Sequence, residues 1–198
     1  MIIFINGSFG IGKTTVARLL AAHLPNSAVF DPEPVGLLLS RLALLLPLAE
    51  RTDDFQDLVS WRRTSIRAIS LALRFRKTVI VPMAFSNVSY LGEFLSHFRD
   101  RAIPTHHFCL TAPHRVVLAR LHARERRRGP DQWQLRRSAE CCDVHGAPEF
   151  AEHIPTADHS ALEVANEILG RIHRGADGPS AARVADSAAS ARSGRRSA

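Results

Sequence analysis

The sequence predicts an α/β fold of three layers, in which a parallel five-stranded sheet is covered by helices on both faces. Short apolar runs, typical of buried strands, alternate with longer segments that repeat apolar residues at helical spacing. A glycine-rich turn joins the first apolar run to the first helical segment. This alternation is typical of parallel sheets. The 198 residues suit one domain, and 45% apolar and 23% charged residues are ordinary for a globular chain.

The strands are expected at residues 2–6, 28–31, 78–82, 105–110 and 150–156. Helices are expected after the glycine-rich turn, at 35–46, 57–75 and 88–99, from about 113, and after Ser160, which forms a capping box with Glu163. We expect the strand order 2-3-1-4-5 and a domain that spans 1–174. Residues 175–198 carry almost no large apolar side chains, so they are predicted to be a disordered tail.

Composition excludes several classes of protein. The three cysteines, Cys109, Cys141 and Cys142, argue against a disulfide framework and fit a reducing cytoplasm. Cys142 and His145 lack a second ligand pair at zinc-site spacing, so we interpret them as an ordinary thiol and a loop histidine. No apolar run reaches the ~20 residues that span a bilayer, and no basic segment precedes the apolar start. A cytoplasmic protein without signal peptide or membrane span is therefore expected.

The glycine-rich turn carries the clearest motif. Residues 7–14 read Gly-Ser-Phe-Gly-Ile-Gly-Lys-Thr and fit G-x-x-x-x-G-K-[ST] between a strand and a helix. In such a loop the backbone N–H groups and the helix dipole attract phosphate oxygens. Lys13 is expected to reach the β- and γ-phosphates of ATP, and Thr14 to bind Mg²⁺; a side chain at Gly7, Gly10 or Gly12 would block the phosphates. The predicted nucleotide-binding residues are Gly7, Ser8, Phe9, Gly10, Ile11, Gly12, Lys13, Thr14 and Thr15.

Asp31 ends the second predicted strand. Ligands of open α/β sheets bind beyond the carboxyl ends of the strands, so Asp31 is expected to face the nucleotide. There it either accepts the proton of an acceptor hydroxyl or binds magnesium through water; the alternative is a cap for the next turn. The end of the third strand, 80–83, has no acid where many P-loop ATPases bind magnesium. This argues against a motor or switch ATPase and permits a small-molecule kinase.

Arginine is concentrated in one segment. Residues 115–137 hold eight arginines against Glu125 and Asp131, which is +6 of the chain's net +7. Arg120 and Arg124 are one helical turn apart, and a mobile arginine-rich lid at about 122–140 is predicted to close on the transferred phosphoryl group. The alternatives for Arg126–Arg128 are a solvated face or non-specific contact with RNA. A nucleic-acid binder would spread such charge over a face, so nucleic acid is the less favoured partner.

The chain resembles tunicamycin-resistance proteins, a branch of the nucleoside and nucleotide kinase-like P-loop fold. The resemblance covers residues 1 to about 173. It rests on the opening INGSFGIGKT, on the phrases FDPE, DDFQ and IVPM in that order, and on the pair Arg120 and Arg124.

The resemblance implies ATP and Mg²⁺ as cofactors and a tunicamycin-like nucleoside antibiotic as small-molecule substrate. Protection would come from phosphorylation of a hydroxyl or, alternatively, from ATP-dependent sequestration. Lys13, Asp31, Arg120 and Arg124 would be the catalytic residues. Substrate contacts are expected at Asp31, Glu33, Gln56, Trp61, Arg62 and Met83; for Trp61 the alternative is core packing. The family can carry an amphipathic C-terminal helix that holds it at a membrane, but the residues after 175 lack that pattern.

Overall fold

The computed structural model describes residues 1–32, 54–124 and 132–177. Its sheet has five strands in the order β2-β3-β1-β4-β5, and every neighbouring pair is parallel. The predicted fold class and strand order are therefore confirmed. The strands are β1 (Ile2–Gly7), β2 (Ser27–Val29), β3 (Thr78–Pro82), β4 (Thr105–Thr111) and β5 (His153–Pro155).

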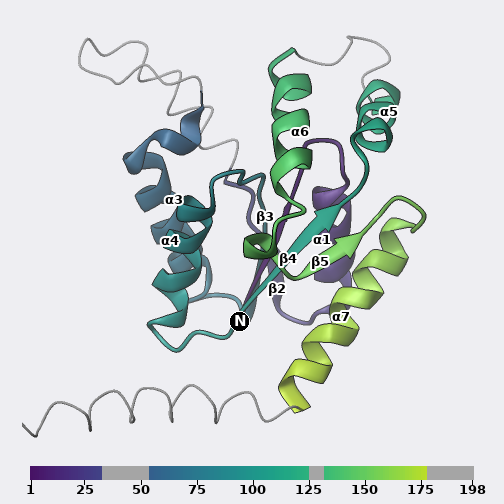
Figure 1. The fold of residues 1–198 in the computed structure, drawn as a ribbon. Helices are drawn as coiled ribbons and strands as arrows, with labels where there is room; N and C mark the ends of the chain where they lie inside the picture. The colour runs from purple at the N-terminus through teal and green to yellow at the C-terminus, as the bar shows by residue number, and fades with distance from the viewer. Residues whose placement is uncertain (33–53, 125–131, 178–198) are drawn as a thin grey trace, which may run out of the picture.

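Helices cover both faces of the sheet and its carboxyl end (Figure 1). One face packs against α1 (Lys13–His23) and α7 (Ala161–Asp177), and the other against α3 (Val59–Ala72) and α4 (Val88–Arg99). Above the strand ends lie α5 (His114–Arg124) and α6 (Gln132–Val144), and the 3₁₀ turns are η1 (Phe55–Asp57) and η2 (Pro148–Phe150). Among the described residues, no helix is long and apolar enough to cross a membrane.

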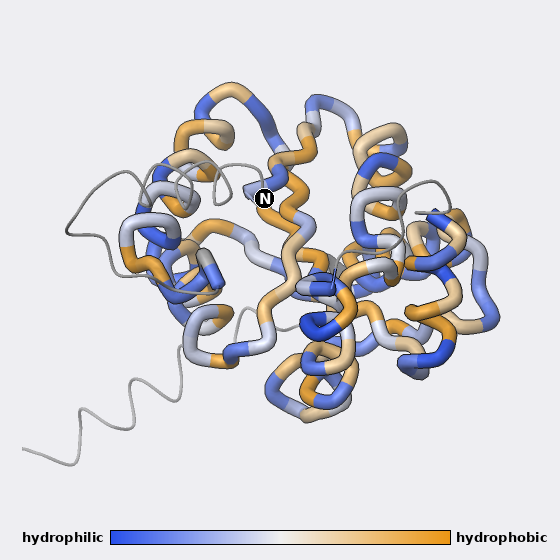
Figure 2. The backbone as a smooth tube through the Cα atoms, turned by 90° about the horizontal axis from the view of Figure 1, so that it is seen from above, coloured by the Kyte–Doolittle hydropathy of each residue, from blue (hydrophilic) through white to orange (hydrophobic). Residues whose placement is uncertain are grey.

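The sheet separates two hydrophobic cores. Side chains of β1 alternate between them, with Ile3 and Ile5 in one core and Ile2 and Phe4 in the other, as a strand of period two requires. Hydrophobic residues follow the central strands between the helices (Figure 2). With both faces buried, β1 is apolar along most of its length, which is why the apolar runs predicted the strands.

The predicted capping box is confirmed at the start of α7. The Ser160 hydroxyl accepts from the Glu163 N–H at 3.2 Å, and a Glu163 oxygen accepts from the Ser160 N–H at 2.7 Å. The helix continues to Asp177, beyond the predicted domain boundary at residue 174. The tail prediction from residue 178 on lies outside the described residues.

Three element predictions differ from the structure. The second strand ends at Val29 rather than at residue 31, and the helix expected at 57–75 is the turn η1 followed by α3. The helix α6 was not expected, and it occupies the second half of the predicted lid at 122–140. The helix predicted at 35–46 and Arg126–Arg128 of the lid lie outside the described residues.

Candidate functional site

The turn from β1 into α1 wraps around the side chain of Lys13. Its ammonium donates to the Gly7 carbonyl at 2.9 Å and the Ser8 carbonyl at 3.1 Å, and it lies 5.1 Å from the centre of the Phe9 ring. An ammonium has three N–H donors, so these two bonds leave one for a phosphate oxygen. The helix begins after Gly12 without a side-chain cap, and its first turn opens toward solvent at Thr14 and Thr15.

The glycines of the turn serve two different purposes. A Cβ at Gly10 would approach the Leu121 Cγ to 2.6 Å, and one at Gly7 would come within 3.0 Å of Ile11 and of the Leu110 carbonyl. At these two positions a side chain would meet the protein itself, an obstacle that the sequence did not predict. Gly12 has φ +110° and no heavy atom within 4 Å of its Cβ direction, so the space in front of it is open.

A cavity of about 280 Å³ lies in front of the helix start. It brings together three groups of residues that lie far apart in the sequence: the phosphate loop, Asp31 after β2, and two arginines of α5. Among the described residues that line it, Asp31 is the only carboxylate. The lining residues are Phe9, Gly10, Gly12, Lys13, Thr14, Thr15, Asp31, Pro82, Arg120 and Arg124.

The two arginines of α5 have different partners. Arg120 donates to the Ile11 carbonyl at 3.2 Å, and to the Thr156 hydroxyl and carbonyl at 3.0 and 2.6 Å. It therefore fastens the phosphate loop to the segment between β5 and α7. Arg124 is exposed and donates to the Gln134 side chain of α6 at 2.7 Å. An exposed guanidinium at the cavity wall can exchange that bond for a phosphate oxygen.

Four of the predicted substrate contacts are described besides Asp31, and none of these four lines this cavity. Gln56 is 3% exposed and donates to the Ala84 carbonyl at 3.1 Å. Trp61 is 1% exposed, packs in the core between α3 and α4, and donates to the Pro32 carbonyl at 3.1 Å. This placement corresponds to the core-packing alternative for Trp61. Met83 is also buried, and its neighbour Pro82 reaches the cavity instead.

Arg62 also directs its polar atoms inward. It forms an ion pair of 2.7 Å with Glu93, donates to the carbonyls of Gln56 and Asp57, and stacks over the Tyr90 ring at 4.1 Å. Its guanidinium therefore holds the turn η1 in place. The remaining predicted contact, Glu33, lies outside the described residues.

Behind the phosphate loop lies a buried polar cluster that sequence reasoning missed. Asn6, at the end of β1, donates to the Phe85 carbonyl at 3.1 Å and accepts from the Phe85 N–H at 2.9 Å. His145 lies in the turn after α6, as expected of a loop histidine, but it is only 2% exposed and donates to the same carbonyl at 2.6 Å. Burial lowers its pKa to about 4. A polar Asn inside an otherwise apolar strand was the available signal.

The cysteines are free thiols. Cys109 and Cys141 are buried, and burial raises their pKa values to about 12 and about 11. Within the described ranges, no group of three or more His, Cys, Asp or Glu side chains is arranged to bind a metal ion.

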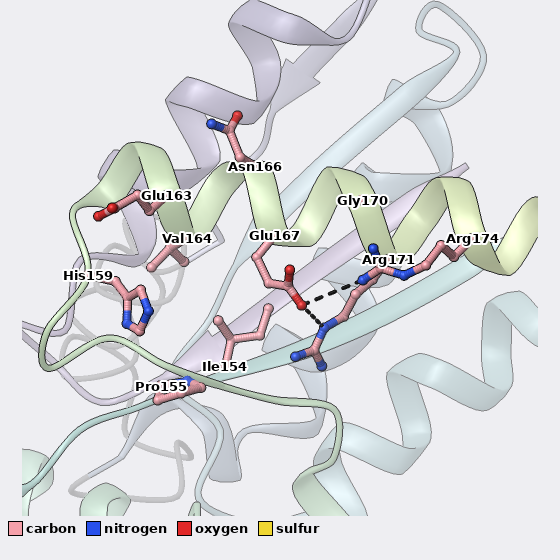
Figure 3. A pocket seen from close by; sticks show the side chains of 10 residues that line it. All are labelled: Ile154, Pro155, His159, Glu163, Val164, Asn166, Glu167, Gly170, Arg171 and Arg174. Atoms are coloured by element: carbon pink, nitrogen blue, oxygen red, sulfur yellow. Dashed lines mark hydrogen bonds and ion pairs between the residues drawn. The ribbon is translucent and has the colours of Figure 1, made fainter.

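A larger cavity of about 550 Å³ lies elsewhere, between β5 and α7 (Figure 3). Its Arg171 forms an ion pair of 2.8 Å with Glu167, and the cavity contains neither the phosphate loop nor Asp31. Because the phosphate loop and Asp31 line the smaller cavity instead, the smaller cavity is the candidate site.

A glycine-rich turn after β1, a lysine at the first turn of α1 and the sheet order 2-3-1-4-5 define a P-loop protein of the kinase-like class. The family model described as an AAA domain matches residues 2–141. The tunicamycin resistance protein of Deinococcus radiodurans is 34% identical, and the alignment covers 86% of this chain and 94% of that chain with a TM-score of 0.68. The chain therefore belongs to the tunicamycin-resistance family of P-loop proteins.

Two kinases share the fold at lower identity. A gluconokinase from Sinorhizobium meliloti is 19% identical over 88% of this chain and 93% of that chain, with a TM-score of 0.59. Shikimate kinase from Acinetobacter baumannii is 17% identical over the same shares, also with a TM-score of 0.59. A comparison with curated protein sequences gives no match.

Proposed function

We propose that this protein is an ATP-dependent phosphotransferase that acts on a hydroxyl of a tunicamycin-like nucleoside antibiotic. The observation that carries the proposal is the single cavity shared by the phosphate loop, Asp31 and Arg124. The same cavity thus offers donors for phosphates, a carboxylate for an acceptor hydroxyl, and an exposed guanidinium. The substrate class is taken from the name of the Deinococcus relative.

The residues of the cavity fit MgATP. The open space at Gly12, the uncapped start of α1 and the remaining N–H of Lys13 can receive phosphate oxygens, and the exposed Thr14 hydroxyl can bind Mg²⁺. MgATP supplies the phosphoryl group. Lys13 and Arg124 stabilise the negative charge on its oxygens, whereas Arg120 holds the loop in position through the Ile11 carbonyl.

Asp31 is assigned to the acceptor. Pro82 occupies the end of β3 at the cavity, and among the described residues that line the cavity Asp31 is the one carboxylate. A carboxylate at this position would orient the acceptor hydroxyl and take its proton as the new oxygen–phosphorus bond forms and the bond from the γ-phosphorus to the departing ADP breaks. The acceptor would then lie beyond the ends of β2 and β3, next to Pro82.

Survival of a tunicamycin-sensitive bacterium that expresses the protein tests the proposal. Lys13→Ala and Asp31→Asn should each abolish protection, because one removes phosphate binding and the other removes the proton acceptor. Arg18→Ala, an exposed arginine on the same helix, is the matched control and should protect as well as the wild type. Sequestration of the antibiotic is the second candidate, favoured by the absence of an acid at the end of β3. It predicts that Asp31→Asn still protects while Lys13→Ala does not.

A further inference from the structure

Helix α6 contacts the phosphate loop directly. The Ser8 hydroxyl donates to the Ser138 carbonyl at 3.1 Å, and the Trp133 ring meets the Phe9 ring edge-on with 5.2 Å between their centres. Its Gln134 also accepts the bond from Arg124 at the cavity wall. One side of this helix is therefore in contact with the elements that bind phosphate.

The same helix reaches the turn η1 and the loop after β3 through Arg137. Arg137 is 9% exposed, and its Nη2 lies 2.8 Å from an Asp54 carboxylate oxygen. Its Nη1 donates to Glu140 at 2.6 Å and to the Ser86 hydroxyl at 3.1 Å. Arg137 thus joins α6 to the residue before η1 and to the loop after β3.

Asp54 organises the turn that follows it. Its Oδ1 accepts from the Gln56 N–H at 2.9 Å, and its carbonyl accepts from the Asp57 N–H at 3.1 Å. Burial raises the pKa of the Asp54 carboxyl, while the Gln56 N–H and the Arg137 charge oppose that change. A carboxylate placed there without a cation would be costly, so the ion pair fixes the turn to α6.

We propose that Arg137 is a positioning residue that holds η1, through Asp54, against the helix that contacts the phosphate loop, so that nucleotide binding orders η1. This inference rests on the proposed function. It adds a residue outside the phosphate motif and outside the predicted contacts.

A second connection runs in parallel. Asn6, near the end of β1, donates to the Phe85 carbonyl. The Gln56 side chain of η1 donates to the carbonyl of the neighbouring residue, Ala84. Nucleotide binding could therefore also affect η1 through β1 and residues 84–85, without Arg137. The two routes are separable, because only one of them depends on the Asp54–Arg137 charges.

The test is hydrogen–deuterium exchange of the Gln56 and Asp57 amides with and without a non-hydrolysable ATP analogue and Mg²⁺. In the wild type the analogue should slow their exchange about five-fold. In Asp54→Asn this response should disappear, although Asn keeps the oxygen that accepts from Gln56. Analogue affinity, measured by calorimetry on the same samples, should change by less than about three-fold.

Two further variants keep the test decisive. Asp54→Asn with Arg137→Gln removes both buried charges together, leaves no unpaired charge to unfold the protein, and should also lose the response. Glu140→Gln removes the half-exposed partner of Arg137 and should retain it. A response that persists without the Asp54–Arg137 charges, or is absent in a wild type that binds the analogue, overturns the inference. A wild type that does not bind the analogue overturns the proposed function as well.

Discussion

Gly10 is the residue of the phosphate loop whose identity is most tightly fixed by the protein around it. Its φ of +81° is a conformation that side chains other than glycine adopt at a cost of about 1–2 kcal/mol. Its Cβ direction also points at Leu121 of α5, 2.6 Å away. Gly12 shares the positive φ but faces open space. Substitutions at Gly10 and Gly12 therefore distinguish the cost of backbone strain alone from the cost of strain with a steric clash.

Gly10→Ala should lower the free energy of unfolding by about 2–4 kcal/mol, and Gly12→Ala by about 1–2 kcal/mol, because only Gly10 adds a clash to the strain. Urea unfolding at neutral pH measures both. Gly10→Ala combined with Leu121→Ala should cost less than the sum of the single changes, since the shorter side chain makes room. Equal losses for the two glycines, or simple additivity of the pair, would contradict this account.

At the residue scale, the sequence predicted the phosphate loop, Asp31 and the α5 arginines because each follows a strand or lies on a recognisable helix face. It did not predict that Gln56 and Arg62 would bind protein carbonyls. A polar side chain next to an expected site has the same appearance in a sequence whether its partner is a ligand or the backbone. Only the fold shows that Ala84, Gln56 and Asp57 supply those carbonyls.

At the scale of the elements, α5 and α6 show what periodicity can and cannot reveal. Helix α5 was predictable from Val117 and Leu121, which are buried. The buried residues of α6 are Arg137, Ser138 and Cys141, so its inward face has no apolar repeat that would mark a helix. Helix α6 packs against polar partners around the phosphate loop, which explains its polar composition. That composition is also why the sequence predicted a lid in this segment.

Substitutions of the two α5 arginines should affect different properties, because Arg120 stabilises the fold and Arg124 takes part in phosphoryl transfer. Arg120→Ala removes three bonds between elements, so it should lower the melting temperature by about 4–8 °C and weaken ATP binding. Arg120→Lys should not restore either property, because an ammonium cannot reproduce the guanidinium fork. Arg124→Ala should melt within about 2 °C of the wild type but transfer phosphoryl about 100-fold more slowly. Calorimetry and initial rates measure these effects, and an Arg124→Ala variant with unchanged rate would exclude its assigned role.

At the scale of the whole molecule, two buried histidines link stability to pH. Burial lowers the pKa values of His107 and His145 from 6.5 to about 4. Each ring bonds to a backbone carbonyl, His107 to Ala151 at 3.0 Å and His145 to Phe85 at 2.6 Å. The folded protein keeps both rings neutral at a pH where the unfolded chain has already protonated them.

The free energy of unfolding should therefore fall as the pH drops from about 6.5 to about 4, by on the order of 3 kcal/mol for each histidine. The stability is fully present above pH 6.5 and is lost as the unfolded chain takes up protons. His107→Asn and His145→Asn should each flatten this dependence in urea unfolding curves measured across that range. His159→Asn removes the imidazole of an exposed histidine and serves as the control. It should leave the pH dependence of the free energy of unfolding unchanged. A slope that does not respond to the buried variants would show that other groups cause the acid sensitivity.

The central claim is that the cavity of Lys13, Asp31 and Arg124 transfers a phosphoryl group. Mass spectrometry of tunicamycin after incubation with the purified protein and MgATP tests it most directly. The account predicts a product heavier by one phosphoryl group, formed by the wild type and by Arg18→Ala but not by Lys13→Ala or Asp31→Asn. Unmodified tunicamycin in the presence of a wild-type protein that binds ATP would contradict the claim and leave sequestration as the function.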